Sequence, residues 1–140
     1  MSKWDQYFPF NKGDRLDVDG PWNYDGEGEV LDLNDGLLDF NIHIPAVHVF
    51  FKSMPEMSIH FGINYLKEGD GNQAKATING QDFDDPNVII TSREDHRLIQ
   101  SSILIQGKPL IVKMWREEDT LNLKIQGYSF SATRKEFLGG

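Results

Sequence analysis

Hydrophobic and polar residues alternate along three consecutive segments near the middle of the chain. The segments are 38–44, 47–52 and 57–65, and short breaks containing Pro45 and Pro55 separate them. A period of two places successive side chains on opposite faces, so each segment is predicted to be a strand with one buried face. Three such strands in succession predict an antiparallel meander.

Other short segments repeat this period and are also predicted to be strands, over 15–19, 29–33, 74–78, 88–91, 103–105, 110–115 and 121–125. Asn34-Asp35-Gly36 and Asn79-Gly80 are turn signals, because these residues tolerate the positive φ of tight turns. Residues 81–87 are predicted to be an acidic loop. Residues 92–100 fit two turns of helix or a strand, and we favour the strand. Beyond Gly127 the inward parity changes, which predicts a β-bulge.

These patterns predict one all-β domain over residues 1–140, with about ten short strands. The architecture is either an antiparallel β-sandwich of the jelly-roll type or a closed β-barrel, and the uneven strand lengths favour the sandwich. The aromatic arm 1–12 is predicted to dock its rings on the sheet, and residues 134–140 are predicted to be a frayed tail. The inward positions predict a core of Phe40, Ile42, Val49, Phe51, Ile59, Phe61, Leu110, Val112, Leu123 and Ile125.

The chain is acidic, with a net charge of −8, and the first 36 residues hold nine acidic residues against three basic ones. Such a surface repels phosphate, so we expect neither nucleic acid nor an anionic membrane as a partner. A protein with a basic surface, or a cation, remains compatible with this charge. The chain has no cysteine, no apolar signal sequence at residues 1–10 and no apolar run long enough to span a membrane. We therefore expect a soluble, cytoplasmic protein.

The acidic quarter contains two candidate sites. Its carboxylates would supply oxygen ligands to Ca²⁺ or a surface for a basic partner; they are Asp17, Asp19, Asp25, Glu27 and Glu29. Trp22 and Tyr24 lie among them, and exposed aromatic rings beside carboxylates suit a lectin-like sugar site. Asp and Gly are also ordinary turn formers, so we favour a solvated loop with its aromatic rings covered.

Three histidines, His43, His48 and His60, fall on the polar face of the predicted meander, and Asp39 shares that face. Across adjacent strands they would bind Zn²⁺ or Fe²⁺. Their spacing matches no metal-binding motif. We therefore favour surface histidines and expect no bound cofactor, with Zn²⁺ or Ca²⁺ as the alternative.

No nucleophile motif, cysteine or glycine-rich phosphate loop is present. We therefore predict a non-catalytic, acidic binding protein that forms protein–protein interactions, as an inhibitor or immunity-like protein masking a basic partner does. The alternative is a lectin-like module for a carbohydrate or another small ligand. A third hypothesis is a metal-dependent enzyme that uses the histidine face.

Overall fold

The computed structural model describes residues 4–20, 25–49, 52–54, 56–65, 67, 69–93, 96–105, 107–125 and 127–135. This part of the chain forms twelve strands: β1 (Arg15–Asp19), β2 (Asp25–Leu33), β3 (Leu37–Ile44), β4 (Val47–Val49), β5 (Lys52–Met54), β6 (Met57–Asn64), β7 (Gly69–Ile78), β8 (Gln81–Arg93), β9 (His96–Ile105), β10 (Lys108–Glu117), β11 (Thr120–Ile125) and β12 (Tyr128–Arg134). Among the described residues, no helix is long and apolar enough to cross a membrane.

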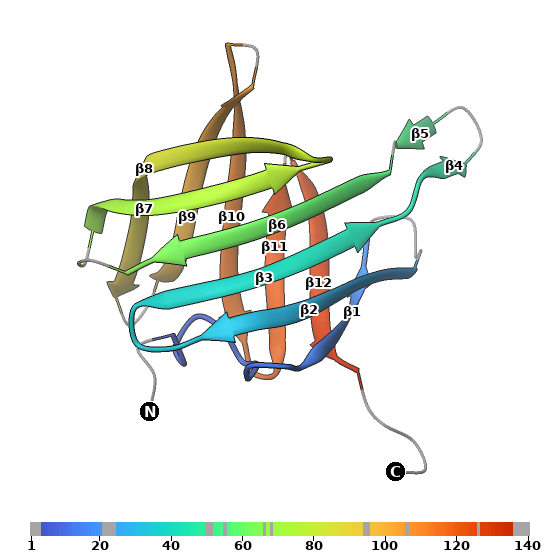
Figure 1. Ribbon diagram of the computed structural model, residues 1–140. Coiled ribbons are helices and arrows are strands. Elements are labelled where there is room, and N and C mark those ends of the chain that lie inside the picture. The colour runs from blue at the N-terminus through green and yellow to red at the C-terminus, as the bar shows by residue number, and fades with distance from the viewer. Residues whose placement is uncertain are drawn as a thin grey trace.

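Ten strands form a closed antiparallel barrel, in the order β1-β12-β11-β10-β9-β8-β7-β6-β3-β2 (Figure 1). The ladder closes between β1 and β12, where Leu16 lies opposite Arg134 and Asp19 lies opposite Ser131. The all-β prediction is confirmed, whereas the preference for a sandwich is wrong. Periodicity identifies the buried face of each strand but does not say whether the first and last strands pair.

The barrel is flattened into two layers. Figure 1 shows β2, β3, β6 and β7 in front, crossing β9, β10, β11 and β12 behind them at a steep angle. The long strand β8 bends from the front layer into the back layer. The β7–β8 register shifts around Asn72, and such bulges bend strands at the corners of a barrel.

Asn72 is fully buried beside this corner, and its side chain holds the preceding loop in place. Its amide oxygen accepts a hydrogen bond from the Lys67 N–H (2.9 Å), and its amide nitrogen donates to the carbonyls of Lys67 (2.7 Å) and Gly69 (3.0 Å). Every side-chain polar atom of this buried residue therefore has a partner, as burial of an amide requires.

Two glycines, Gly26 and Gly28, allow β2 to pack closely against β1 and β3. Gly26 and Gly28 lie opposite the buried residues Val18 and Leu16 of β1. A Cβ at Gly28 would lie 2.7 Å from the Asn41 carbonyl oxygen, and a Cβ at Gly26 would lie 3.0 Å from the Val18 Cβ. Glycine is required at position 28 because the contacting atom belongs to the backbone of β3 and has little freedom to move.

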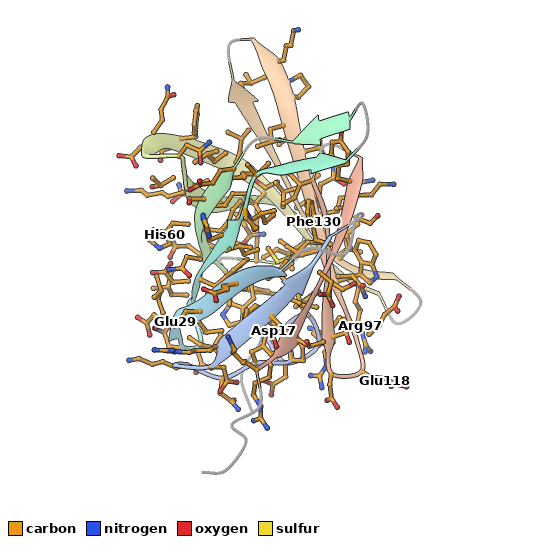
Figure 2. The ribbon with its side chains drawn as sticks, turned by 90° about the vertical axis from the view of Figure 1, so that its right-hand side faces the viewer. Asp17, Glu29, His60, Arg97, Glu118 and Phe130 are labelled. Carbon is orange, nitrogen blue, oxygen red and sulfur yellow. The ribbon has the colours of Figure 1, made fainter. Side chains whose placement is uncertain are left out.

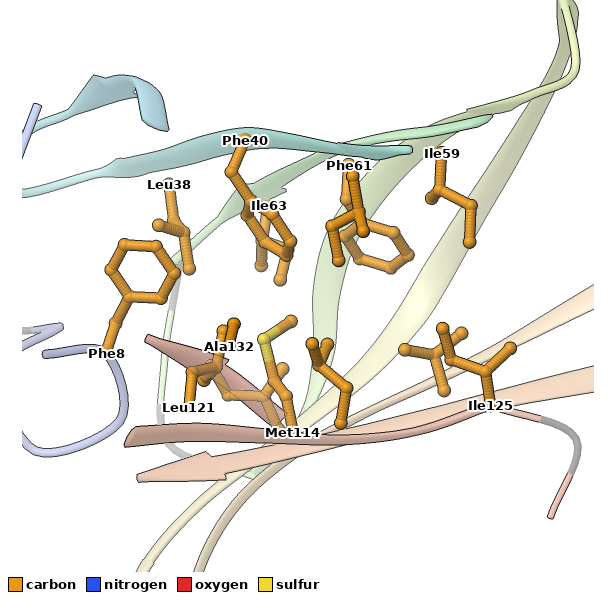
Figure 3. Close-up of a cluster of buried hydrophobic side chains, with 14 of the residues drawn as sticks. Phe8, Leu38, Phe40, Ile59, Phe61, Ile63, Met114, Leu121, Ile125 and Ala132 are labelled. Atoms are coloured by element: carbon orange, nitrogen blue, oxygen red, sulfur yellow. The ribbon is translucent and has the colours of Figure 1, made fainter. Parts of the chain in front are cut away.

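The core lies between the two layers, with Phe40, Phe61 and Ile63 from the front facing Met114 and Leu121 from the back (Figure 3). The Phe40 and Phe61 rings stack with centroids 6.2 Å apart. Eight predicted core residues are buried: Phe40, Ile42, Ile59, Phe61, Leu110, Val112, Leu123 and Ile125. The side chains of the other two, Val49 and Phe51, lie outside the described residues.

The aromatic arm docks on the barrel, as the sequence predicts. Trp4, Tyr7, Phe8 and Phe10 are all buried. The Trp4 indole N–H donates to the carbonyl of Asn34 (2.9 Å), in the turn between β2 and β3. Phe8 extends the core at one end of the barrel, where its ring lies 5.6 Å from that of Phe40 (Figure 3).

The predicted meander is wrong in its middle strand. β3 pairs directly with β6, so that Phe40 lies opposite Phe61. The segment between them instead forms the short β4–β5 hairpin, with His48 opposite Ser53. Figure 1 shows this hairpin projecting beyond the barrel. Alternation within a segment does not identify its partner strand, and three or four alternating residues also suit a separate hairpin.

Three local predictions also need correction. Residues 81–87, expected to be an acidic loop, belong to β8. Gly127, with φ of 81°, lies in the turn between β11 and β12 rather than in a bulge, because Ile125 pairs with Tyr128. The first two residues of the predicted frayed tail belong to the barrel instead. Arg134 is the last residue of β12, and the Lys135 N–H donates to the Arg15 carbonyl (2.7 Å). Residues 136–140 lie outside the described part.

The core makes a quantitative prediction. Phe61 is 2% exposed and packs on Phe40, so Phe61→Ala should lower the free energy of unfolding by about 3–5 kcal/mol. Leu104 is 67% exposed, so Leu104→Ala should change it by no more than about 0.5 kcal/mol. Urea denaturation of both variants measures this difference. A loss below about 1 kcal/mol for Phe61→Ala would contradict the inward face assigned to β6.

Candidate functional site

The outward side chains of β1, β2 and β3 form a largely polar surface. Cross-strand register places Asp17 opposite Glu27, and Glu27 opposite His43. Figure 2 shows Asp17 and Glu29 on this side of the barrel. We call the outward carboxylates of these three strands the acidic face; they are Asp17, Asp19, Glu27, Glu29, Asp32 and Asp39.

Like charges lie opposite one another on the acidic face. Asp17 faces Glu27 across the β1–β2 ladder, and Asp32 faces Asp39 across the β2–β3 ladder. Directly opposed like charges destabilise an antiparallel pair. The strands therefore form against a local electrostatic cost, which nearby cations reduce.

Two lysines from outside these strands contact the acidic face. The Lys135 ammonium lies 3.9 Å from both the Asp17 and Glu27 carboxylates, and the Lys12 ammonium lies 3.8 Å from Asp32. These lysines are at least half exposed, and ion pairs of this kind contribute little because water screens them. The compensation is therefore partial, and the face stays negative.

The acidic residues singled out in the sequence are thus brought together: Asp17, Asp19 and Glu29 lie on strands, as predicted, and Glu27 lies on a strand rather than on the expected loop. β2 begins at Asp25, so Glu27 and Glu29 lie in the strand. Asp25 lies opposite Asp19 in register, and its side chain falls outside the described residues. So do the proposed sugar-binding residues Trp22 and Tyr24, of which the structure describes nothing.

A shallow hollow of about 220 Å³ lies over β1, β2 and β3, beside Lys135. Its lining mixes the cations Arg15 and Lys135 with the carboxylates Glu27 and Glu29. Arg15 lies opposite Glu29 in register. Because each cation lies near a carboxylate, this hollow offers no uniform charge to a ligand.

Two histidines of the polar face, His43 and His60, each pair with a carboxylate. His43 on β3 lies 3.0 Å from Glu56 through its Nε2, and His60 on β6 hydrogen-bonds through its Nε2 to Asp39. His60 is exposed, and Figure 2 shows it on the outside of the barrel. The outward placement of His43 and His60 is therefore confirmed.

The proposed three-histidine site is not assembled by the described backbone. His43 lies opposite Ser58 on β6, whereas His48 lies on the separate β4–β5 hairpin. The His48 side chain is outside the described part. Within that part, no group of three or more His, Cys, Asp or Glu side chains is arranged to hold a metal ion.

A larger hollow, of about 460 Å³, lies over β3, β6, β7 and β8. Gly62 stands at its centre, with Asp39 opposite on β3 and Lys75 opposite on β7. Because Gly62 has no side chain, the row of side chains from Asp39 to Lys75 is interrupted. We call this depression the Gly62 hollow; its polar rim is Asp39, His60, Asn64, Lys75, Thr77, Asp82 and Asp84.

The alternating pattern does not predict the Gly62 hollow, although the sequence contains one signal of it. Gly62 occupies an outward position in an alternating strand, where a polar side chain is expected. Asp82 and Asp84 were assigned to a loop, whereas both lie on β8, where Asp82 accepts a hydrogen bond from the Thr77 hydroxyl (2.8 Å). The site depends on pairing between β6, β7 and β8, which the pattern alone does not state.

No protein-family model, curated protein or solved structure matches this chain.

Two glycines give a paired test of this geometry. Gly28→Ala should lower the free energy of unfolding by about 1–3 kcal/mol, because the new methyl group would overlap the Asn41 carbonyl. Gly62→Ala should be neutral or stabilise by up to about 1 kcal/mol, because the nearest atoms lie 3.8 Å and 3.9 Å away. Chemical denaturation compares the two variants. Equal losses would contradict the different surroundings of these positions.

Calcium should raise the melting temperature no more than magnesium does at matched ionic strength. Calcium needs six to eight converging oxygens, whereas Asp17 and Glu27 project side by side from neighbouring strands and share Lys135. Thermal melts with each ion, and with chelator, measure this. A saturable rise with calcium alone would contradict the expectation and favour the lectin-like alternative.

Proposed function

We propose that this protein is a non-catalytic binding protein whose acidic face docks on the basic surface of a protein partner. The observation that carries the proposal is the strand register of β1, β2 and β3. It concentrates six carboxylates on one surface, with opposed like charges at Asp17–Glu27 and Asp32–Asp39. A basic partner would reduce the repulsion between these carboxylates. Binding would therefore gain both from that relief and from the attraction between opposite charges.

The back layer carries a pair of neighbouring positive charges, which supports an oriented partner. Lys113 on β10 lies directly opposite Lys124 on β11, and their neighbours in the same row are Gln100 and Ser129. A surface that served only solubility would mix its charges evenly. Separation of charge between the two layers instead steers a charged partner toward one side.

The proposed partner is a protein rather than a nucleic acid or an anionic membrane, since the acidic face would repel phosphate. An inhibitor or immunity-like role fits this arrangement, because a rigid barrel with a fixed carboxylate pattern masks a basic surface without needing to rearrange. Rigid surfaces lose little conformational entropy when they bind.

Charge-neutral variants test the proposal. Asp17→Asn with Glu27→Gln should weaken binding to the partner about tenfold, because two charges that attract the basic surface are lost. Raising the ionic strength from ~0.01 M to ~0.15 M should weaken the wild type more than the variant, since screening acts on the exposed charges. Pull-down at both salt concentrations, followed by calorimetry with the recovered partner, measures these effects.

Asp119→Asn is the matched control, because this exposed carboxylate lies in the turn between β10 and β11, outside the acidic face. It should leave the partner's affinity within about twofold of the wild type. Equal binding by the wild type and the double variant would contradict the proposal. So would a partner whose contacting surface is neutral or acidic.

A further inference from the structure

We propose that the Gly62 hollow is the anchor point of the basic partner and takes one arginine side chain through its guanidinium group. This inference rests on the proposed function and assigns to it a specific site and a specific partner residue. It is supported by the shape of the hollow, by the charge of its rim and by the hydrogen-bonding groups on that rim.

The shape suits a single inserted side chain. Cross-strand register runs from Asp39 through Gly62 and Lys75 to Asp84, and only the glycine position lacks a side chain. The resulting volume of about 460 Å³ falls within the range of small-ligand sites, about 300–1,000 Å³. The hollow also adjoins the acidic face, because Asp39 belongs to both.

The rim is negative and partly pre-positioned. Asp39, Asp82 and Asp84 outnumber the single lysine of the described rim, Lys75. The Asp39 side chain is only 24% exposed, and its hydrogen bond with His60 fixes its orientation. Asp82 is oriented by the Thr77 hydroxyl. Acceptors held in place before binding lose little entropy when a donor arrives.

Asp84 is the carboxylate left available for the ligand. Within the described part of the chain, it has no hydrogen bond or ion pair, although it lies opposite Lys75. A guanidinium group donates through a planar fork and pairs with carboxylates in a bidentate manner, and it is more weakly hydrated than an ammonium group. An incoming arginine would therefore reach Asp84 and the accessible edge of Asp39 from the same depression.

The same rim is less suited to the other candidate ligands. A lysine ammonium is a compact, strongly hydrated point charge that cannot bridge two carboxylates in a plane. A sugar ring usually stacks on an exposed aromatic face, whereas the one phenyl ring in the described lining, Phe83, is partly buried and packs against the core. Charge and donor geometry therefore favour arginine.

Three small probes test the anchor by NMR titration: the Nα-acetyl methylamides of arginine, lysine and citrulline. Citrulline is the neutral isostere of arginine, so it isolates the contribution of the charge. The arginine probe should bind saturably with a dissociation constant on the order of 1 mM, which is typical of one small charged group. Its shifts should centre on His60, Gly62 and Lys75. The lysine probe should bind at least about threefold more weakly, and the citrulline probe should not saturate.

Substitutions at the centre and on the rim complete the test. Gly62→Leu should abolish arginine binding by filling the hollow, while an unfolding transition like that of the wild type shows that this variant still folds. Asp84→Asn should weaken binding about fivefold, and Asp119→Asn should have no effect. Equal shifts with citrulline, arginine binding that survives Gly62→Leu, or saturable binding of a neutral monosaccharide in place of arginine would overturn the proposal.

The two proposals fail in different ways. If Gly62→Leu leaves the partner's affinity unchanged while the Asp17→Asn and Glu27→Gln pair weakens it, the arginine anchor is wrong and the acidic docking surface stands. If the arginine probe binds at Gly62 but no basic partner depends on Asp17 and Glu27, the proposed function is wrong and the arginine site stands. Calorimetry with both variants separates these results.

Discussion

Closure of the ladder between β1 and β12 is the constraint on which the rest of the structure depends. It pairs Leu16 with Arg134 and so fixes the register of β1, which then fixes the register of β2 and β3. Because side chains alternate across a strand, a shift of one residue would turn every carboxylate of the acidic face inward. The same closure places Lys135, from the end of the chain, beside Asp17 near its beginning. Topology and surface charge are therefore set together.

Much of the local structure was predictable because its causes are local. The turn at Asn79-Gly80 follows from residues that tolerate positive φ, since they adopt φ of 49° and 86°. The turn at Asn34 has another local cause: residues 34–36 do not adopt positive φ, and the Asn34 side-chain oxygen accepts hydrogen bonds from the Gly36 and Leu37 N–H groups (both 3.0 Å). The inward faces of β3, β6, β10 and β11 follow from alternation. Gly127 was misassigned because a bulge and a tight turn both use a glycine with positive φ, so the local signal is the same.

Pairing between distant strands could not be read from the pattern, and the candidate sites depend on that pairing. His43 and His60 were correctly placed on the polar face, yet their partners, Glu56 and Asp39, come from the register between β3 and β6. The Gly62 hollow requires β6 to lie between β3 and β7. Alternation along β6 shows that Gly62 faces outward, but not which side chains surround it.

The barrel stays folded despite the like charges on its acidic face because its core contributes far more free energy than those charges cost. Each opposed pair of like charges costs roughly 0.2–1 kcal/mol, whereas removing the ring of one buried phenylalanine such as Phe61 costs about 3–5 kcal/mol. The core therefore tolerates several unfavourable surface pairs without losing the fold. Gly28 shows where that tolerance ends, because a single methyl group there would meet the backbone of β3. Outward positions are thus free to vary for recognition, while inward positions at the corners are fixed by packing.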